Sequence, residues 1–199
     1  MYFSDIKIKI NPTTYLVWLV LILSGRSTLL LCSLVCAVLH ECSHVAAYLT
    51  YGAYVTQIEV LPFGFSANVG KTDKLTCAGE CFCAFCGPVM NLFLSAVFLL
   101  MSEAYFGDCE YFIFCNLSLF IINMLPVIPP DGGRMLYFLL LKYKGVSLAV
   151  KVSKIISVLV TVIVLLIGVF ILIESGYNAF VLVIGCYLLI YLLTSDSCF

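Results

Sequence analysis

Charged side chains are scarce in this chain of 199 residues, at 11% against 63% hydrophobic ones. Soluble domains carry about 25% charged residues, so this composition excludes an ordinary soluble protein and indicates an integral membrane protein. The net charge of -1 lacks the basic excess of a nucleic-acid surface, so we expect no nucleic-acid partner. Long polar linkers, internal repeats and low-complexity tracts are also missing. We therefore expect a single membrane-embedded domain over residues 1–199.

Cysteine, by contrast, is plentiful, with eleven residues. Most of them lie inside apolar runs, where a free cysteine behaves as a small hydrophobic side chain. The tightest set is Cys77, Cys81, Cys83 and Cys86, and it lacks the paired C-x-x-C spacing that makes a metal or redox site convincing. We interpret most cysteines as packing residues, and the role of this set stays open.

Apolar runs dominate the chain, and a membrane-crossing helix needs about 20 such residues. The sequence offers six candidate spans, at residues 12–24, 27–51, 75–101, 111–125 with its continuation, 147–173 and 177–193. The first is short and begins at a proline, which is favoured at the first position of a helix. No small-residue cleavage site follows it, so we interpret it as a retained span rather than a signal peptide. Whether it crosses fully stays open.

The few basic residues orient these spans. If six spans alternate, nine of the ten Lys and Arg residues fall on one side, and Arg26 alone falls on the other. The positive-inside rule then places both termini in the cytoplasm. We therefore expect an all-α, multi-pass protein of a bacterial cell membrane.

One stretch departs from the helical pattern. Residues 55–69, between the second and third spans, are rich in β-branched and aromatic side chains and include a Pro-Phe-Gly turn signal. This pattern predicts one or two short strands. An extended substrate segment pairing with such a strand is one interpretation, because strand addition makes few demands on sequence. A re-entrant loop that covers the site is the alternative.

Both histidines of the chain lie in "HECSH", His40 to His44, inside the second span. Residues four apart share one face of a helix, so the two rings can bind one metal ion. Glu41 lies to the side of that face, where it can reach a metal-activated water without being a ligand. Two histidines bonded across helices, with Glu41 as a paired charge, are the alternative. Ionisable groups within a span are costly and usually functional, which favours one zinc ion per chain.

A catalytic zinc site takes three protein ligands, so one more is needed. Two acidic residues are candidates, Glu80 near the start of the third span and Asp131 after the fourth. Asp131 is favoured because Pro126, Pro129 and Pro130 must interrupt the helix before it. Open backbone at membrane depth is tolerated only where it is buried or lines a water-filled cavity. An ordinary turn at a helix end is the alternative for this segment.

The chain resembles the site-2 protease family of intramembrane metalloproteases, and within it the compact sporulation stage IV type. The resemblance is carried by "HECSH" and by "NMLPVIPPDGG", Asn123 to Gly133, with "LPFGFSA", Leu61 to Ala67, and "GPVMN", Gly87 to Asn91, as secondary marks. It covers the chain from the second span to just past Asp131.

The resemblance implies a three-helix catalytic core made of spans two to four. It also implies zinc held by His40, His44 and Asp131, Glu41 as catalytic base and Asn123 near the substrate or oxyanion. Family members of the sporulation type cleave a membrane-associated transcription-factor precursor on the cytoplasmic side. No PDZ domain and no C-terminal nucleotide-sensing domain is present in this sequence, so regulation by either is not expected.

From these features we expect a zinc endopeptidase that cuts a membrane-associated protein, such as a sporulation sigma-factor precursor, with membrane inhibitors or regulators as further partners. We expect Asn123 to donate a hydrogen bond to the oxyanion or to tie its helix to a neighbour. We expect Gly87, Pro88 and Asn91 to give close packing and a bend in the third span, with a direct catalytic part as the alternative. A catalytically silent scaffold that retains the zinc site is the alternative function. A metal transporter is disfavoured because residues 157–173 and 180–193 contain no His, Asp or Glu. The substrate, the cleavage site and the oligomeric state stay open.

Overall fold

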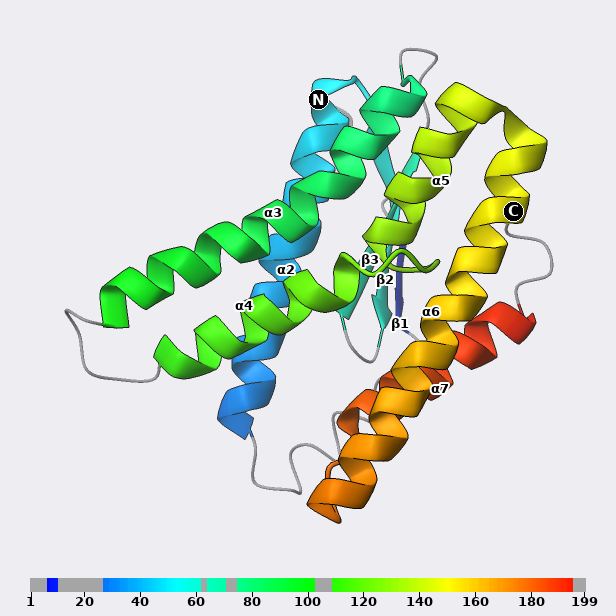
Figure 1. Cartoon of the computed structure of the whole chain (residues 1–199). Coiled ribbons are helices and arrows are strands. Elements are labelled where there is room, and N and C mark those ends of the chain that lie inside the picture. The colour runs from blue at the N-terminus through cyan, green and yellow to red at the C-terminus, as the bar shows by residue number, and fades with distance from the viewer. Residues whose placement is uncertain (1–6, 11–26, 62–63, 71–74, 103–108, 195–199) are drawn as a thin grey trace. The chain divides into compact units, whose positions relative to one another are not determined.

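A computed structural model describes residues 7–10, 27–61, 64–70, 75–102 and 109–194. In these ranges the chain is mostly helical (Figure 1). The first candidate span, at residues 12–24, lies outside them. The chain divides into two compact units, Met1–Ile122 and Asn123–Phe199, which are described in turn.

Two long helices form the framework of the first unit. They are α2, Ser27–Thr50, and α3, Cys77–Ser102. At about 1.5 Å per residue, 24 and 26 residues extend for roughly 36 and 39 Å, which exceeds the hydrocarbon thickness of about 30 Å. Both are apolar enough to cross a membrane. They correspond to the second and third predicted spans.

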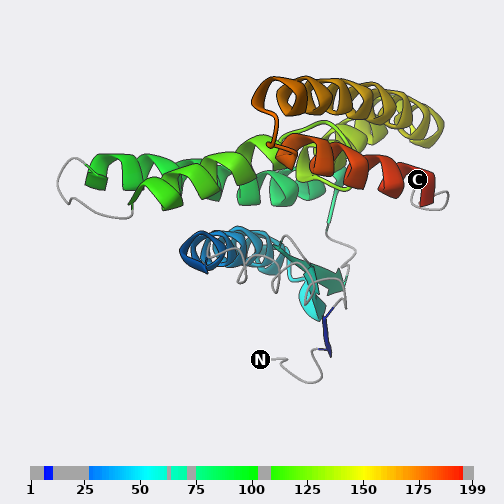
Figure 2. The same cartoon turned by 90° about the horizontal axis from the view of Figure 1, so that it is seen from below.

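A shorter apolar helix, α4, Cys109–Asn123, runs beside α3 in both views (Figures 1 and 2). The rings of Phe98 and Phe112 stack between these helices with their centroids 4.7 Å apart. Further along, Cys32 and Cys36 of α2 pack with Cys115 of α4 in one buried cluster. These thiols fill helix interfaces as small apolar groups do.

A three-stranded sheet completes the first unit. Its strands are β1, Lys7–Ile10, β2, Tyr54–Leu61, and β3, Gly64–Gly70. The order is β1-β2-β3, with β1 parallel and β3 antiparallel to β2. Strand β1 had no counterpart among the expected elements, because four residues of lysine and isoleucine give too short a pattern to separate from a helix end. Since β3 packs on α2, the sheet lies against the helix that carries both histidines.

The described part of the second unit contains three helices, α5, Asp131–Lys144, α6, Val146–Ser175, and α7, Phe180–Thr194. The predicted break in the fourth span is confirmed: α4 stops at Asn123, residues 124–130 are non-helical, and α5 begins at Asp131. Three prolines within 126–130 explain the break, because proline lacks the N–H that a helix interior requires.

Glycines allow α6 and α7 to pack closely side by side (Figures 1 and 2). A Cβ added at Gly168 would lie 2.6 Å from the Cα of Leu182, and one at Gly185 would lie 2.8 Å from the Cδ2 of Leu165. Such small-residue contacts are typical of helices packed in membranes. In the part of the chain that the structure describes, α2, α3 and α6 are long and apolar enough to cross a membrane, whereas α4 and α7 are shorter. Six spans therefore stay a prediction.

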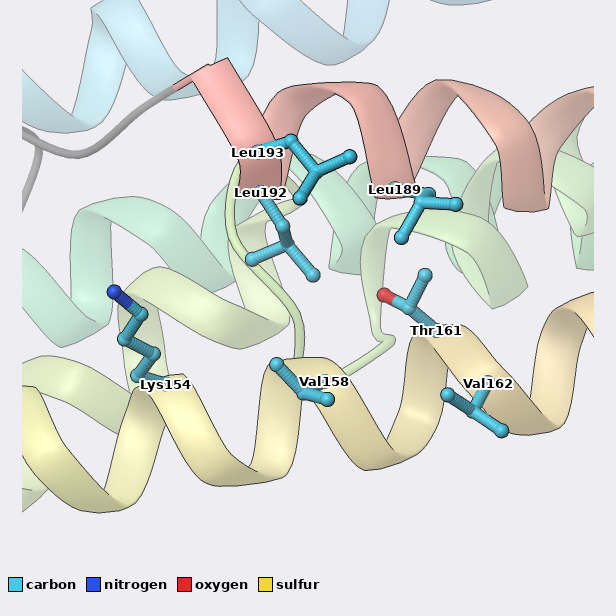
Figure 3. A pocket seen from close by; sticks show the side chains of 7 residues that line it. All are labelled: Lys154, Val158, Thr161, Val162, Leu189, Leu192 and Leu193. Carbon is cyan, nitrogen blue, oxygen red and sulfur yellow. The ribbon is translucent and has the colours of Figure 1, made fainter.

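A cavity of about 370 Å³ lies between α6 and α7 (Figure 3). It is lined by Lys154, Val158, Thr161, Val162, Leu189, Leu192 and Leu193. Lys154 is the one charged side chain among them, and the lining contains no His, Asp, Glu or Cys. The cavity therefore lacks the groups that hydrolysis requires, and the candidate site lies elsewhere.

Candidate metal centre

The two histidines face each other on the buried side of α2. His40 and His44 are 4% and 5% exposed, and their Nε2 atoms lie 3.1 Å apart. The rings meet edge to face, with an angle of 81° between their planes. The spacing of four residues therefore has the consequence expected from helix geometry, namely two imidazoles at one point.

Neighbouring groups on α3 hold the other ring nitrogen of each histidine. The Nδ1 atom of His44 lies 2.7 Å from the carbonyl oxygen of Cys83, and the Nδ1 atom of His40 contacts Oδ1 of Asn91. A carbonyl oxygen can only accept, so these contacts place a proton on each Nδ1 and make each Nε2 an acceptor.

This arrangement fits a metal ion. Two acceptor nitrogens 3.1 Å apart repel each other unless a proton or a cation lies between them. Histidines that bind metals usually donate their second ring N–H to a carbonyl or carboxylate, which fixes the ring and the tautomer. His40 and His44 both have such a partner. The donor set suits zinc, for which neutral imidazole is a preferred ligand.

Gly87 of α3 provides the room for this pair. A Cβ at this position would lie 2.6 Å from Cε1 of His44 and 2.7 Å from Cε1 of His40, closer than real side chains approach. The next residue, Pro88, lies inside α3 and removes one helical hydrogen bond from this turn. Gly87 was expected to allow close packing, and what it packs against is the histidine pair.

Glu41 follows His40 directly on α2 and is partly exposed. The two residues between Glu41 and His44 have no metal-binding arrangement. Cys42 is exposed as a free thiol, and the hydroxyl of Ser43 donates to the carbonyl oxygen of His40 at 2.6 Å. Glu41 is thus the one carboxylate in the turn between the two histidines.

Glu80, the weaker of the two acidic candidates, has a partner of its own. Its side chain is buried, and Oε2 accepts a hydrogen bond of 2.8 Å from the hydroxyl of Tyr48. Tyr48 lies one turn after His44 on α2 and belongs to the buried cluster with Ala47, Ala53 and Cys83. This bond gives Glu80 a structural role between α2 and α3.

Asp131, the stronger candidate, is the buried first residue of α5 in the second unit. Its Oδ1 lies 3.5 Å from Nη1 of Arg134, and a helix N-terminus favours a negative charge. Gly132 fits only because it has no side chain, since a Cβ there would lie 2.6 Å from the carbonyl oxygen of Leu125. The Pro-Asp-Gly-Gly sequence therefore lets the first turn of α5 pack closely against the non-helical residues 124–130.

Asn123 is the last residue of α4 and is half-buried. Its role stays a prediction. Two other asparagines, Asn91 and Asn116, are fully buried and hydrogen-bonded to each other. Asn91 was expected to serve packing, and Asn116 was not among the predicted site residues. An asparagine within an apolar helix was the available signal, because such side chains hydrogen-bond across helices.

None of the four cysteines of the "CAGECFCAFC" set belongs to a metal-binding cluster within the described ranges. None of the four forms a disulfide in the described part of the chain, and Cys83 is buried. The chemical contribution of this set comes from the backbone of Cys83, whose carbonyl oxygen faces His44.

Comparison with known proteins finds one family match and several related proteins. The model of peptidase family M50 matches residues 107–167, a stretch that contains Asn123 and Asp131. Stage IV sporulation protein FB of Bacillus subtilis (strain 168) is 28% identical over 140 residues. A zinc metalloprotease of Methanocaldococcus jannaschii is 31% identical, also over 140 residues. The chain thus contains a match to peptidase family M50 and is similar in sequence to these two proteins.

The fold agrees with this match. The site-2 protease from Methanocaldococcus jannaschii superposes with a TM-score of 0.75 at 24% sequence identity, over 97% of this chain and 92% of that one. The predicted resemblance to the site-2 protease family is thus confirmed. The matched stretches cover 69% and 67% of this chain but only 49% and 40% of the two curated relatives. Activity, substrate and partners of this chain are therefore proposals.

Proposed function

We propose that this chain is an intramembrane zinc metalloprotease of the M50 type that hydrolyses a peptide bond of a membrane-associated protein. The observation that carries the proposal is the buried histidine pair, with both Nε2 atoms turned toward one point and a glutamate directly after the first histidine. Burial of such a pair in a helix able to cross a membrane costs free energy, and ionisable side chains in such helices are usually functional.

His40, His44 and Asp131 are the proposed ligands. Two imidazoles and one carboxylate are a usual set for catalytic zinc, which keeps a fourth position open. Asp131 is supported by its burial and by the open segment before it, whereas Glu80 already bonds to Tyr48. When bound, zinc would supply Lewis-acid activation of a water molecule and of the scissile carbonyl group.

Glu41 is the proposed catalytic residue. Its carboxylate accepts the proton of the attacking water and returns it to the leaving amine, acting as general base and then general acid. Its partial exposure supports this role, because a proton-transfer group must meet both water and substrate. We further propose that Asn123 donates a hydrogen bond to the developing oxyanion.

An extended substrate is part of the proposal, because a helical backbone hides the carbonyl that must be attacked. In the described sheet β2 is central, and β3 is an edge strand that packs on α2. An edge strand offers main-chain donors and acceptors to a further strand. We propose that the substrate segment pairs along β3 next to the histidines.

Sporulation appears in the name of one relative, Stage IV sporulation protein FB, and this supports a sporulation sigma-factor precursor as the substrate. We place cleavage near the cytoplasmic side with both termini cytoplasmic, and we propose membrane inhibitors or regulators as partners. These assignments rest on the family resemblance and on the distribution of Lys and Arg.

The decisive experiment is to coexpress the chain with a candidate membrane-bound sigma-factor precursor and compare wild type with Glu41→Gln. Zinc content is measured in both purified proteins. We expect Glu41→Gln to retain zinc and lose processing by roughly 10²-fold or more, which is the usual contribution of a general base. Equal processing by both proteins would refute the protease assignment. A partner-dependent effect that Glu41→Gln leaves intact would favour the silent scaffold instead.

A further inference from the structure

Two buried amides connect α4 to the histidine pair. Nδ2 of Asn91 donates to Oδ1 of Asn116 at 2.9 Å, and Oδ1 of Asn91 contacts Nδ1 of His40. Nδ2 of Asn116 donates to the carbonyl oxygen of Phe112 at 2.8 Å and to Sγ of Cys36 at 3.1 Å. Both asparagines have no exposed surface, so water does not compete for these bonds.

The orientation of each amide follows from the one before it. The carbonyl oxygen of Phe112 can only accept, so Asn116 must turn its NH₂ group toward it. This leaves the oxygen of Asn116 facing Asn91, which must present its own NH₂ group in return. The oxygen of Asn91 then faces His40.

We infer from this geometry that Asn116 is a positioning residue, which acts through Asn91 to fix the tautomer of His40. With an acceptor at Nδ1, His40 carries its proton there and keeps Nε2 available as a ligand. With a reversed Asn91, an NH₂ group would face Nδ1 and favour the tautomer that is protonated at Nε2, which cannot bind metal through Nε2. His44 needs no such chain, because the carbonyl oxygen of Cys83 fixes its tautomer directly.

This inference rests on the proposed zinc site and adds a determinant on α4, outside the histidine motif. Partners of metal-bound histidines typically contribute 10- to 100-fold in metal affinity. In membranes, asparagine pairs also stabilise helix packing. The test must therefore separate orientation of His40 from packing of α3 against α4.

The first arm measures zinc affinity by competition with a chelator, using the full chain in detergent. We expect Asn116→Leu to bind zinc roughly 10- to 100-fold more weakly, because Asn91 loses the acceptor that holds its NH₂ group. Ser95→Ala is the matched control: Ser95 is also buried on α3, one turn after Asn91, and its loss should leave zinc affinity unchanged. Wild-type affinity in Asn116→Leu would overturn the inference.

The second arm is rescue. A carboxylate accepts at both oxygens and needs no orienting partner. Asn91→Asp combined with Asn116→Leu should therefore recover most of the zinc affinity that Asn116→Leu alone loses. If Asn116 serves packing alone, the double variant should not recover zinc affinity. Equally weak zinc binding by the double and single variants would therefore contradict the orientation mechanism.

The third arm uses the fact that the chain has only two histidines. Isotope-labelled histidine gives ring N–H signals for His40 and His44 alone, in both metal-free and zinc-saturated protein. We expect Asn116→Leu to speed solvent exchange of the His40 ring proton and to leave that of His44 unchanged. Equal change at both residues would indicate loss of packing and overturn the inference. This arm does not depend on cleavage, so it stands even where the protease assignment fails.

Discussion

At the scale of single residues, the site depends on the space between α2 and α3 as much as on its ligands. His40 and His44 can approach within 3.1 Å because Gly87 presents no side chain to them. A glycine inside a helix costs about 1 kcal/mol relative to alanine. The position is therefore occupied by a residue that weakens the helix but leaves room for two rings.

This balance gives opposite expectations for stability and metal binding. Gly87→Ala should displace both rings and lower zinc affinity at least tenfold, while α3 itself gains helix propensity. Gly79→Ala is the matched change on the same helix, since its Cβ would lie 3.2 Å from the ring of Tyr51, a contact that small shifts can relieve. Zinc titration and thermal unfolding of the metal-free proteins measure both effects. Unchanged zinc affinity in Gly87→Ala would contradict the geometry.

Glu80 provides a second test at this scale. Tyr48→Phe removes the hydroxyl that donates to Glu80 and leaves a buried acceptor without that bond, which typically costs about 1–3 kcal/mol. We expect a lower free energy of unfolding in denaturant and an unaltered zinc content. A loss of zinc on Tyr48→Phe or on Glu80→Gln would instead make Glu80 part of the metal site.

The sequence predicted His40, His44, Glu41 and Asp131 because their chemistry is rare in apolar surroundings. It could not predict the link from Asn91 to Asn116, since these residues lie on different helices and their contact depends on how α3 packs against α4. Cys83 was considered for its thiol, whereas its backbone carbonyl makes the contact with His44. Every residue has a backbone carbonyl, so the sequence does not indicate which one contacts His44. Only the structure identifies this partner.

At the scale of elements, the long apolar runs 27–51, 75–101 and 147–173 correspond to α2, α3 and α6 within a few residues at either end. Strong patterns of this length are the most reliable signal in a sequence. The break before Asp131 was also predicted, from its prolines, but the separate helix α5 was not. Its apolar content is interrupted by Arg134, Lys142 and Lys144, so it lacks the pattern of a span.

The prediction at this scale concerns the outer edge of strand β3. In an antiparallel pair, adjacent residues of one strand alternately bond the partner and point away from it. Proline removes the N–H of the residue it replaces. Of Ala67→Pro and Asn68→Pro in β3, one should therefore disrupt pairing with β2, and the other should block only the outer edge.

We expect the edge-blocking variant to keep its fold and zinc content yet lose cleavage of the membrane substrate. Cleavage assays, zinc analysis and unfolding curves on both variants distinguish the two cases. Full cleavage by both variants, each of them folded, would exclude strand addition at β3. That result would leave a covering loop as the role of this region.

At the scale of the whole molecule, the proposed ligands come from both compact units, His40 and His44 from Met1–Ile122 and Asp131 from Asn123–Phe199. A metal ion bound by all three proposed ligands would stabilise the folded state of both units. The gain follows mass action, about 2.7 kcal/mol at a zinc concentration 100 times the dissociation constant. Zinc should therefore act on α5 as well as on α2.

Hydrogen exchange with and without a chelator tests this coupling. In wild type we expect zinc to slow amide exchange both around His40 on α2 and in the first turns of α5. In Asp131→Asn, zinc affinity should fall and α5 should lose the zinc-dependent protection, because an amide is a poorer ligand than a carboxylate for this ion. Glu80→Gln is the matched control and should keep protection in both units. Zinc-dependent protection of α5 that survives in Asp131→Asn would show that another residue completes the site.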